Sequence, residues 1–156
     1  MNIGIDYDLF LREYQRLPNK QCTFSQCSNL LDHPAFVEDK FFLISDQKKE
    51  WELQKSFRSP LCLSYPSYLP VIETCNFVDD KVTECLKANL DVMLTDDVFL
   101  AFRVQEEQIP VILLNRPWNE SFYELGDNIY RVFSWAEVAE ILLEISAAIA
   151  AATERK

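Results

Sequence analysis

The sequence predicts an α/β fold, a three-layer Rossmann-like arrangement in which a parallel sheet carries helices on both faces. The first observation is that short apolar runs typical of buried strands alternate with amphipathic runs typical of helices. The second is that 156 residues with 49% hydrophobic content suit one continuous core. We therefore predict a single domain over residues 1–156.

The first half of the chain contains two predicted strands. Residues 2–6 and 40–45 are short apolar runs bounded by charged residues, a pattern typical of buried strands. Residues 46–57 are polar with a few spaced apolar positions, which indicates a surface helix. Residues 60–70 contain three prolines, each of which removes a backbone donor, so we expect a loop with one short strand at most.

The second half of the chain alternates more regularly. Apolar residues at helical spacing predict helices within residues 79–90 and 98–108. Apolar runs predict strands within residues 91–97, 109–115 and 128–133. This repeated order of strand and helix favours parallel pairing, because a parallel strand needs a crossover connection.

The last predicted helix has the clearest start signal. Ser134 is followed three residues later by Glu137, the spacing of a capping box, and the helix extends to about residue 152. Its apolar face consists of Val138, Ile141, Leu142, Ile145 and Ile149. These positions predict that the helix covers one face of the sheet.

Residues 11–39 break the alternation, because their apolar side chains are scattered among polar ones. We interpret this segment as a short cap insertion over the edge of the sheet. It contains Cys22, Cys27 and the only histidine, His33, but their spacing matches no zinc pattern. The five cysteines are odd in number and irregularly spaced, so we expect free thiols.

Charge and hydropathy limit the partners. The chain has 25 acidic and 15 basic residues, and its net charge of -10 disfavours nucleic acid and anionic membrane surfaces. It shows neither a signal-peptide pattern nor an apolar stretch of about 18 residues that could span a bilayer. We therefore expect a cytoplasmic protein of undetermined oligomeric state.

Polar and acidic residues follow three of the predicted strands. Parallel strands place their carboxyl ends at one edge of the sheet, where α/β proteins bind ligands. Clustered carboxylates repel one another unless a cation lies among them, and oxygen ligands at this density suit Mg²⁺ shared with a phosphate. A lysine and a hydroxyl would offset the phosphate charge. The candidate residues are Asp6, Asp8, Ser45, Lys81, Asp96 and Asp97.

The same positions resemble the haloacid dehalogenase (HAD) superfamily. Its phosphatases carry D-x-D after the first strand, Ser or Thr after the second, Lys ahead of the fourth and an acidic pair after it. The matching segments are IGIDYD, FFLIS, DDKVTECLKANLDVMLTDD and IPVILLNRPWN. The last two, with the helix start RVFSWAE at Arg131–Glu137, are similar to the small 5'-nucleotidase-like branch of that superfamily.

The resemblance implies a Mg²⁺-dependent hydrolase, a phosphatase that acts on a small phosphorylated substrate and, in this branch, on a nucleotide. Asp6 would be the nucleophile that forms an aspartyl-phosphate, and Asp8 would be the general acid and base. Ser45 and Lys81 would hold the phosphoryl oxygens. The implied metal ligands are Asp6, Asp8, Asp96 and Asp97, with Asp97 as the direct ligand of the pair and Asp96 in support.

The loop that follows the predicted strand at 109–115 belongs to this resemblance. It carries Asn115, Arg116, Trp118 and Asn119, and in the similar branch it lies beside the site. We interpret it as a turn in which Trp118 packs against the core rather than as a substrate contact.

Other functions remain open. Leu9 and Phe10 stand where the family has Gly and Thr, which favours an inactive HAD-like pseudo-enzyme that serves as a binding or regulatory module. Net charge alone suggests an acidic decoy for a basic protein surface. Acids after strands can also simply cap the next helix, a role that suits Ser45 as well. A phosphorelay receiver domain is disfavoured, because its acidic pair ends the first strand and its lysine ends the last.

Overall fold

The sheet is the centre of the molecule. The structure, a computed structural model, describes residues 1–6, 8–9, 34–36, 39–44, 72–74 and 80–154. These residues form a six-stranded sheet, with order β3-β2-β1-β4-β5-β6 and parallel pairing throughout. The strands are β1 (Asn2–Asp6), β2 (Lys40–Ile44), β3 (Ile72–Thr74), β4 (Val92–Thr95), β5 (Val111–Leu114) and β6 (Ile129–Val132). This Rossmann-like order places a topological switch point between β1 and β4, and the predicted α/β fold is confirmed.

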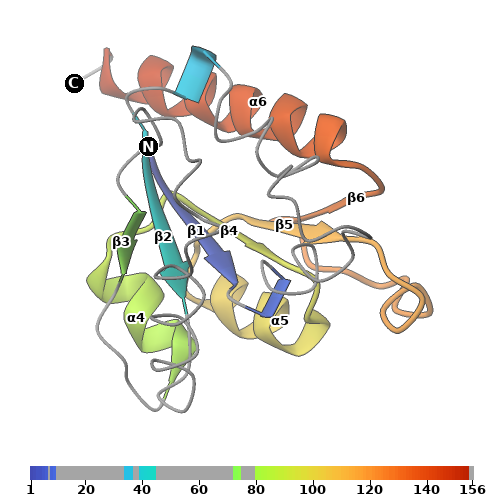
Figure 1. The fold of residues 1–156 in the computed structure, drawn as a ribbon. Coiled ribbons are helices and arrows are strands. Elements are labelled where there is room, and N and C mark those ends of the chain that lie inside the picture. The colour runs from blue at the N-terminus through green and yellow to red at the C-terminus, as the bar shows by residue number, and fades with distance from the viewer. Residues whose placement is uncertain (7, 10–33, 37–38, 45–71, 75–79, 155–156) are drawn as a thin grey trace, which may run out of the picture.

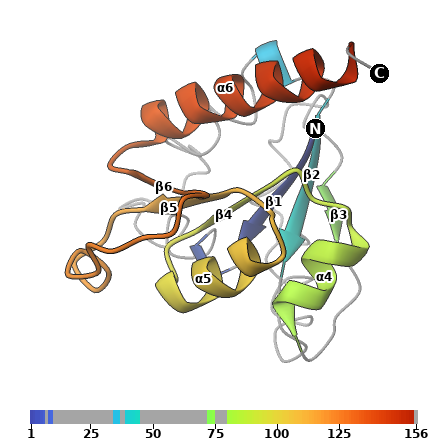
Figure 2. The same cartoon turned by 180° about the vertical axis from the view of Figure 1, so that it is seen from behind.

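Helices cover both faces of the sheet, so the fold has three layers (Figures 1 and 2). On one face lies α6 (Trp135–Thr153), together with the short 3-10 helix η1 (Pro34–Phe36). On the other face lie α4 (Lys81–Lys87) and α5 (Val98–Glu106). The core is correspondingly divided into two clusters of buried apolar residues, one under each helical layer.

Side chains alternate between these two core clusters along each central strand. In β4, Val92 and Leu94 belong to the core under α6, and Met93 belongs to the core under α4 and α5. The same alternation in β5 separates Ile112 from Val111. Because both faces are buried, the strands appear in the sequence as continuous apolar runs rather than as alternating ones.

A glycine in β1 allows α4 to lie close to that strand. A Cβ atom at Gly4 would lie 2.3 Å from Cδ1 of Leu90 and 2.9 Å from Sδ of Met93. Leu90 follows α4, and its backbone N–H donates to the Cys85 carbonyl at 3.1 Å. The missing side chain therefore leaves room for Leu90, just after α4, to pack over β1, and the start of α4 lies at the carboxyl end of β1, where Lys81 contacts Asp6.

The predicted capping box at the start of α6 is confirmed. The Glu137 N–H donates to Ser134 Oγ at 3.2 Å, and the Glu137 carboxylate accepts from Phe133 N at 3.0 Å. Val138 and Leu142 are buried in the core under α6, but Ile149 on the same face is 37% exposed. The 19-residue helix is about 28 Å long and the four-residue strands are about 13 Å long, so its last turns pass beyond the sheet.

Strand β3 is absent from the sequence prediction. It has only three residues, begins two positions after the last proline of the segment 60–70, and pairs with β2 at the edge of the sheet. Several predictions lie outside the described residues: the helix at 46–57, the loop at 60–70 and the cap insertion except for residues 34–36 and 39. Of the cysteines, Cys85 is described; it is buried, and its sulfur is not part of a disulfide.

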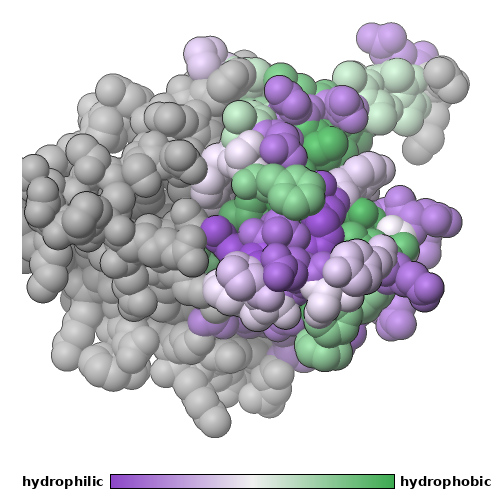
Figure 3. Space-filling view, turned by 90° about the vertical axis from the view of Figure 1, so that its right-hand side faces the viewer, coloured by the Kyte–Doolittle hydropathy of each residue, from purple (hydrophilic) through white to green (hydrophobic). Residues whose placement is uncertain are grey.

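The described surface is mixed in polarity. Viewed from the right-hand side of Figure 1, hydrophobic residues lie in separate patches among hydrophilic ones (Figure 3). Exposed aromatic side chains include Phe99, Tyr123 and Phe133. Among the residues that the structure describes, none of the helices combines the length and the apolarity needed to cross a membrane.

Candidate functional site

Asp6 is the centre of the candidate site. It is the last residue of β1, beside the switch point of the sheet, and it is 1% exposed. Its Oδ1 accepts from Lys81 Nζ at 2.8 Å and from the backbone N–H of Asp8 at 3.2 Å. Its Oδ2 accepts from Thr95 Oγ1 at 2.9 Å. Both oxygens are therefore hydrogen-bonded, which offsets the cost of burying the charge.

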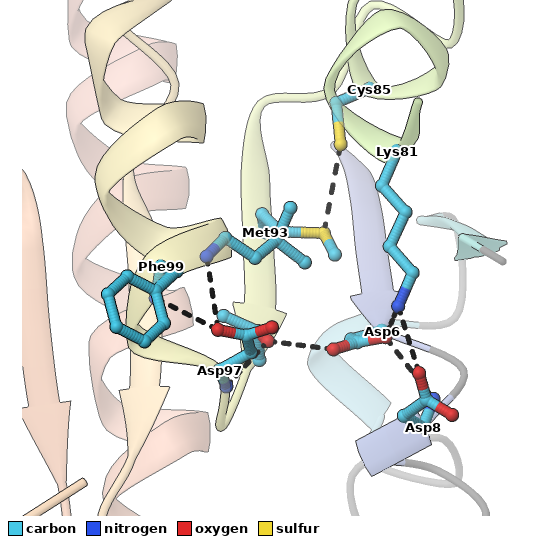
Figure 4. Close-up of polar contacts among 9 residues, drawn as sticks. Asp6, Asp8, Lys81, Cys85, Met93, Asp97 and Phe99 are labelled. Atoms are coloured by element: carbon cyan, nitrogen blue, oxygen red, sulfur yellow. Dashed lines mark hydrogen bonds and ion pairs between the residues drawn. The ribbon is translucent and has the colours of Figure 1, made fainter. Parts of the chain in front are cut away.

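Lys81 joins the two aspartates of the predicted D-x-D motif (Figure 4). It is the first residue of α4, and its Nζ lies 2.8 Å from Asp6 Oδ1 and 3.0 Å from Asp8 Oδ2. Burial alone would lower the pKa of Lys81, but the neighbouring carboxylates outweigh burial and raise that pKa above its ordinary value. The ammonium is therefore charged at neutral pH and binds both acids.

The start of α4 is fixed by Asp80. Its side chain caps the helix by accepting from Val82 N at 3.4 Å. The same carboxylate accepts from Arg103 of α5 at 2.7 Å. Burial would raise the pKa of Asp80, but the hydrogen bonds from Arg103, Thr83 and the Val82 backbone prevail and lower it. These contacts hold Lys81 over β1.

The second acidic pair lies at the end of β4, and its carboxylates have other partners. Asp97 is the N-cap of α5, and its Oδ1 accepts from Phe99 N at 2.9 Å and from Leu100 N at 3.2 Å. Asp96 is fully buried, and its Oδ2 lies 3.7 Å from Arg116 Nε. The structure thus brings together Asp6, Asp8 and Lys81, and it places the Asp97 carboxylate on the first turn of α5.

The loop after β5 is a turn, as predicted, and it packs on the backbone of Asp96. Asn119 is fully buried, and its Nδ2 donates to the carbonyls of Asp96 at 2.9 Å and Leu114 at 3.0 Å. Trp118 also donates from Nε1 to the Asp96 carbonyl, at 3.3 Å. The interpretation of Trp118 as a core residue is wrong, however, because its side chain is 50% exposed.

Arg131 holds this loop from β6. Its NH1 donates to Asn115 Oδ1 at 2.6 Å and to Asn119 Oδ1 at 2.9 Å. Its NH2 donates to the carbonyls of Asn119 at 3.2 Å and Phe122 at 2.6 Å. The arginine in the RVFSWAE segment therefore supports the loop that packs on the Asp96 backbone.

Leu9, which departs from the family pattern, points into the core. Its side chain is 1% exposed and belongs to the cluster that contains Ile3, Ile5 and Phe36. Among the described non-glycine residues, positive φ angles occur at Asn89 and Gln108, so Leu9 adopts no conformation that would need glycine. Leu9 is accommodated without backbone strain. Phe10 and Ser45 lie outside the described residues.

Thr95 is a site residue that sequence reasoning missed. It ends β4, is fully buried and bonds Asp6 through its hydroxyl. The available signal was a hydroxyl at the end of an apolar strand, next to an acidic pair. That signal is weak, because threonine is common in strands for reasons of shape alone.

The described side chains can be compared with the ligands that the implied Mg²⁺ would need. Among the described residues, no group of three or more His, Cys, Asp or Glu side chains could hold a metal ion. The carboxylates of Asp6 and Asp8 nevertheless converge on one cation, the Lys81 ammonium. Mg²⁺ often takes only one or two carboxylates and completes its shell with water and phosphate. The donor type therefore fits Mg²⁺, while the described residues form no complete cage.

Comparison with models of known protein families and with curated protein sequences finds no match to this chain. The fold and the site geometry are therefore the basis for assigning a class. They define a doubly wound α/β protein in which the buried Asp6 and the partly exposed Lys81 and Asp8 form a cluster at the switch point of the sheet.

Proposed function

We propose that this protein is a phosphomonoester hydrolase that forms an aspartyl-phosphate on Asp6. The observation that carries the proposal is the buried Asp6 carboxylate at the carboxyl end of β1, held on one oxygen by Lys81 and on the other by Thr95. Open α/β sheets bind their ligands at this place, outside the carboxyl ends of the strands at a switch point. A fixed carboxylate beside a charged ammonium suits attack on a phosphate.

The proposed reaction has two displacements. Asp6 attacks phosphorus, and the bond from phosphorus to the leaving oxygen breaks while Asp8, which must be protonated at this step, donates its proton to that oxygen. Asp8 then accepts a proton from a water molecule that attacks the aspartyl-phosphate, which releases inorganic phosphate and restores Asp6. Asp8 is better placed than Asp6 to exchange protons with solvent, since its side chain is 27% exposed and that of Asp6 is 1% exposed.

Charge compensation is the task of the cations in this proposal. Lys81 offsets the charge of the phosphoryl oxygens, and Ser45 would donate a hydrogen bond to one of them. Mg²⁺, which the HAD resemblance implies, would bind the Asp6 and Asp8 carboxylates, with Asp97 and Asp96 as further ligands. It would supply the additional positive charge that a phosphate needs among several acids.

The proposed substrate is a small phosphorylated molecule, and the resembling branch favours a nucleotide. The net charge of -10 supports a small ligand over nucleic acid or an anionic membrane. A cytoplasmic location is part of the same proposal.

The direct test is turnover of an aryl phosphate by the purified full chain with Mg²⁺. Asp6→Asn keeps the size of the side chain but removes the nucleophile, so we expect its kcat to fall by about 1000-fold or more. Circular dichroism of the variant checks that it is folded. Equal, background-level turnover by both proteins would contradict the proposal.

A second candidate is an inactive member of this class that acts as a binding or regulatory module. It is favoured by the Lys81 ammonium between Asp6 and Asp8, because both acids already bind a cation of the protein itself. The module would turn over no phosphate ester, while Mg²⁺ or a nucleotide would still raise its melting temperature. Metal-dependent turnover that is lost in Asp6→Asn would exclude it.

A further inference from the structure

The hydroxyl of Thr95 has both of its hydrogen-bonding roles assigned. Thr95 is fully buried, and its Oγ1 accepts from the backbone N–H of Asp97 at 3.0 Å. The same oxygen donates to Asp6 Oδ2 at 2.9 Å. An ionised carboxylate can only accept, so the hydroxyl proton must point at Asp6. Thr95 is therefore the donor and Asp6 the acceptor of this hydrogen bond.

The hydroxyl is the part of Thr95 that packing does not explain. The other residues of β4, Val92, Met93 and Leu94, are buried and apolar, and valine would fill nearly the same volume as threonine. A buried hydroxyl is costly unless it is bonded, and here it joins two groups on adjacent elements. Its particular contribution is therefore the link between Asp6 and the turn at Asp97.

We infer that Thr95 is a positioning residue for Asp6. Lys81 and the Asp8 N–H bind Oδ1, and Thr95 binds Oδ2, so the two sides together fix the rotation of the carboxylate. Without these contacts the carboxylate could take a wide range of orientations, because the χ2 torsion of aspartate has no narrow energy minimum. Reaction rates fall steeply when a nucleophile is turned away from its target. This role rests on the proposed function of Asp6.

Two substitutions in the full chain separate the hydroxyl from the shape of the side chain. Thr95→Val keeps the shape and removes the hydroxyl, and we expect a kcat about 10- to 100-fold lower with KM within about threefold. Thr95→Ser keeps the hydroxyl and removes a methyl group, and we expect kcat within about threefold of the wild type. A purely structural role would make Thr95→Ser the worse variant or would affect both alike. An unchanged kcat in Thr95→Val would overturn the inference.

Crystal structures of the two variants provide a measurement that does not depend on turnover. We expect the Asp6 carboxylate to rotate away from β4 in Thr95→Val and to keep its orientation in Thr95→Ser. If the wild type shows no turnover and Asp6 still rotates in Thr95→Val, the proposed function fails while the positioning role stands. An Asp6 carboxylate that keeps its orientation in Thr95→Val overturns the positioning role whatever the turnover.

Discussion

The carboxyl ends of β1 and β4 each carry two acids, and the fold uses them differently. At β1, the carboxylates of Asp6 and Asp8 bind a side-chain cation, Lys81. At β4, the Asp97 carboxylate binds the backbone amides of α5, and Asp96 is buried beside Arg116. A lysine side chain can move aside when a ligand arrives, whereas the amides that begin a helix cannot. Acids after a strand can therefore differ in role: those at β1 form the proposed phosphate site, and Asp97 at β4 caps a helix.

The largest stability effect is expected at the β1 end. Lys81→Met leaves the buried Asp6 charge without its cation, so we expect the free energy of unfolding to fall by about 3 kcal/mol. Lys81→Arg should lose much less, because it keeps a positive charge. Urea denaturation measures both. In the double variant Asp6→Asn/Lys81→Met the buried charge of Asp6 is gone, so part of the lost unfolding free energy should be recovered. An unchanged midpoint in Lys81→Met would show that the charge cluster does not stabilise the fold.

At the β4 end, the contribution to the stability of the fold should come from hydrogen bonds to the backbone rather than from a charge cluster. Arg131→Ala removes donors to Asn119 and to the loop that packs on Asp96, and we expect a loss of about 2 kcal/mol. Arg103→Ala is the matched control, since its ion pair with Asp80 is exposed and should contribute less than about 1 kcal/mol. Urea denaturation measures both variants. Equal losses in the two variants would contradict the role of Arg131.

Two substitutions at Asp97 distinguish its role as a helix cap from its proposed role as a metal ligand. Asp97→Ala removes the cap of α5 and should cost about 1 kcal/mol, while Asp97→Asn keeps a good cap and should cost only a few tenths. If Asp97 is also a metal ligand, both variants lose Mg²⁺-dependent turnover to a similar degree. Full turnover in Asp97→Asn would restrict Asp97 to the structural role. Thermal unfolding and aryl phosphate hydrolysis, measured on the same samples, distinguish these results.

The smallest expected effect is a dependence on alkaline pH. The pKa of Lys81 is raised above 10.5 in the folded protein, so its contribution to stability is fully present below that pH and is lost as pH rises through the folded pKa. The difference in unfolding free energy between the wild type and Lys81→Met should therefore shrink above pH 10.5. A difference that grows with pH would contradict the assigned contacts.

Regular elements could be predicted from the sequence where one physical signal dominated. The strands β4 and β5 are buried on both faces and appear as apolar runs, and Ser134 with Glu137 marks the start of α6. Strand β3 could not be predicted, since its three residues owe their structure to pairing with β2.

The candidate site was only partly predictable. Lys81 was predicted as a counter-charge for a phosphate near Asp6 and Asp8, and the structure places its ammonium on the two carboxylates themselves. Sequence alone did not show that Asp97 points to amides of its own helix or that Thr95 points to Asp6. Both contacts depend on side-chain rotation, which spacing along the chain does not specify.

The central claim is that Asp6 becomes phosphorylated, and chemical trapping tests it most directly. The full chain is mixed with an aryl phosphate and Mg²⁺, quenched in acid, reduced with borohydride and digested for mass spectrometry. Borohydride converts an aspartyl-phosphate to homoserine, so the account predicts homoserine at position 6 in the wild type and none in Asp6→Asn. Substrate turnover without homoserine at position 6, or with homoserine at another aspartate, would contradict it.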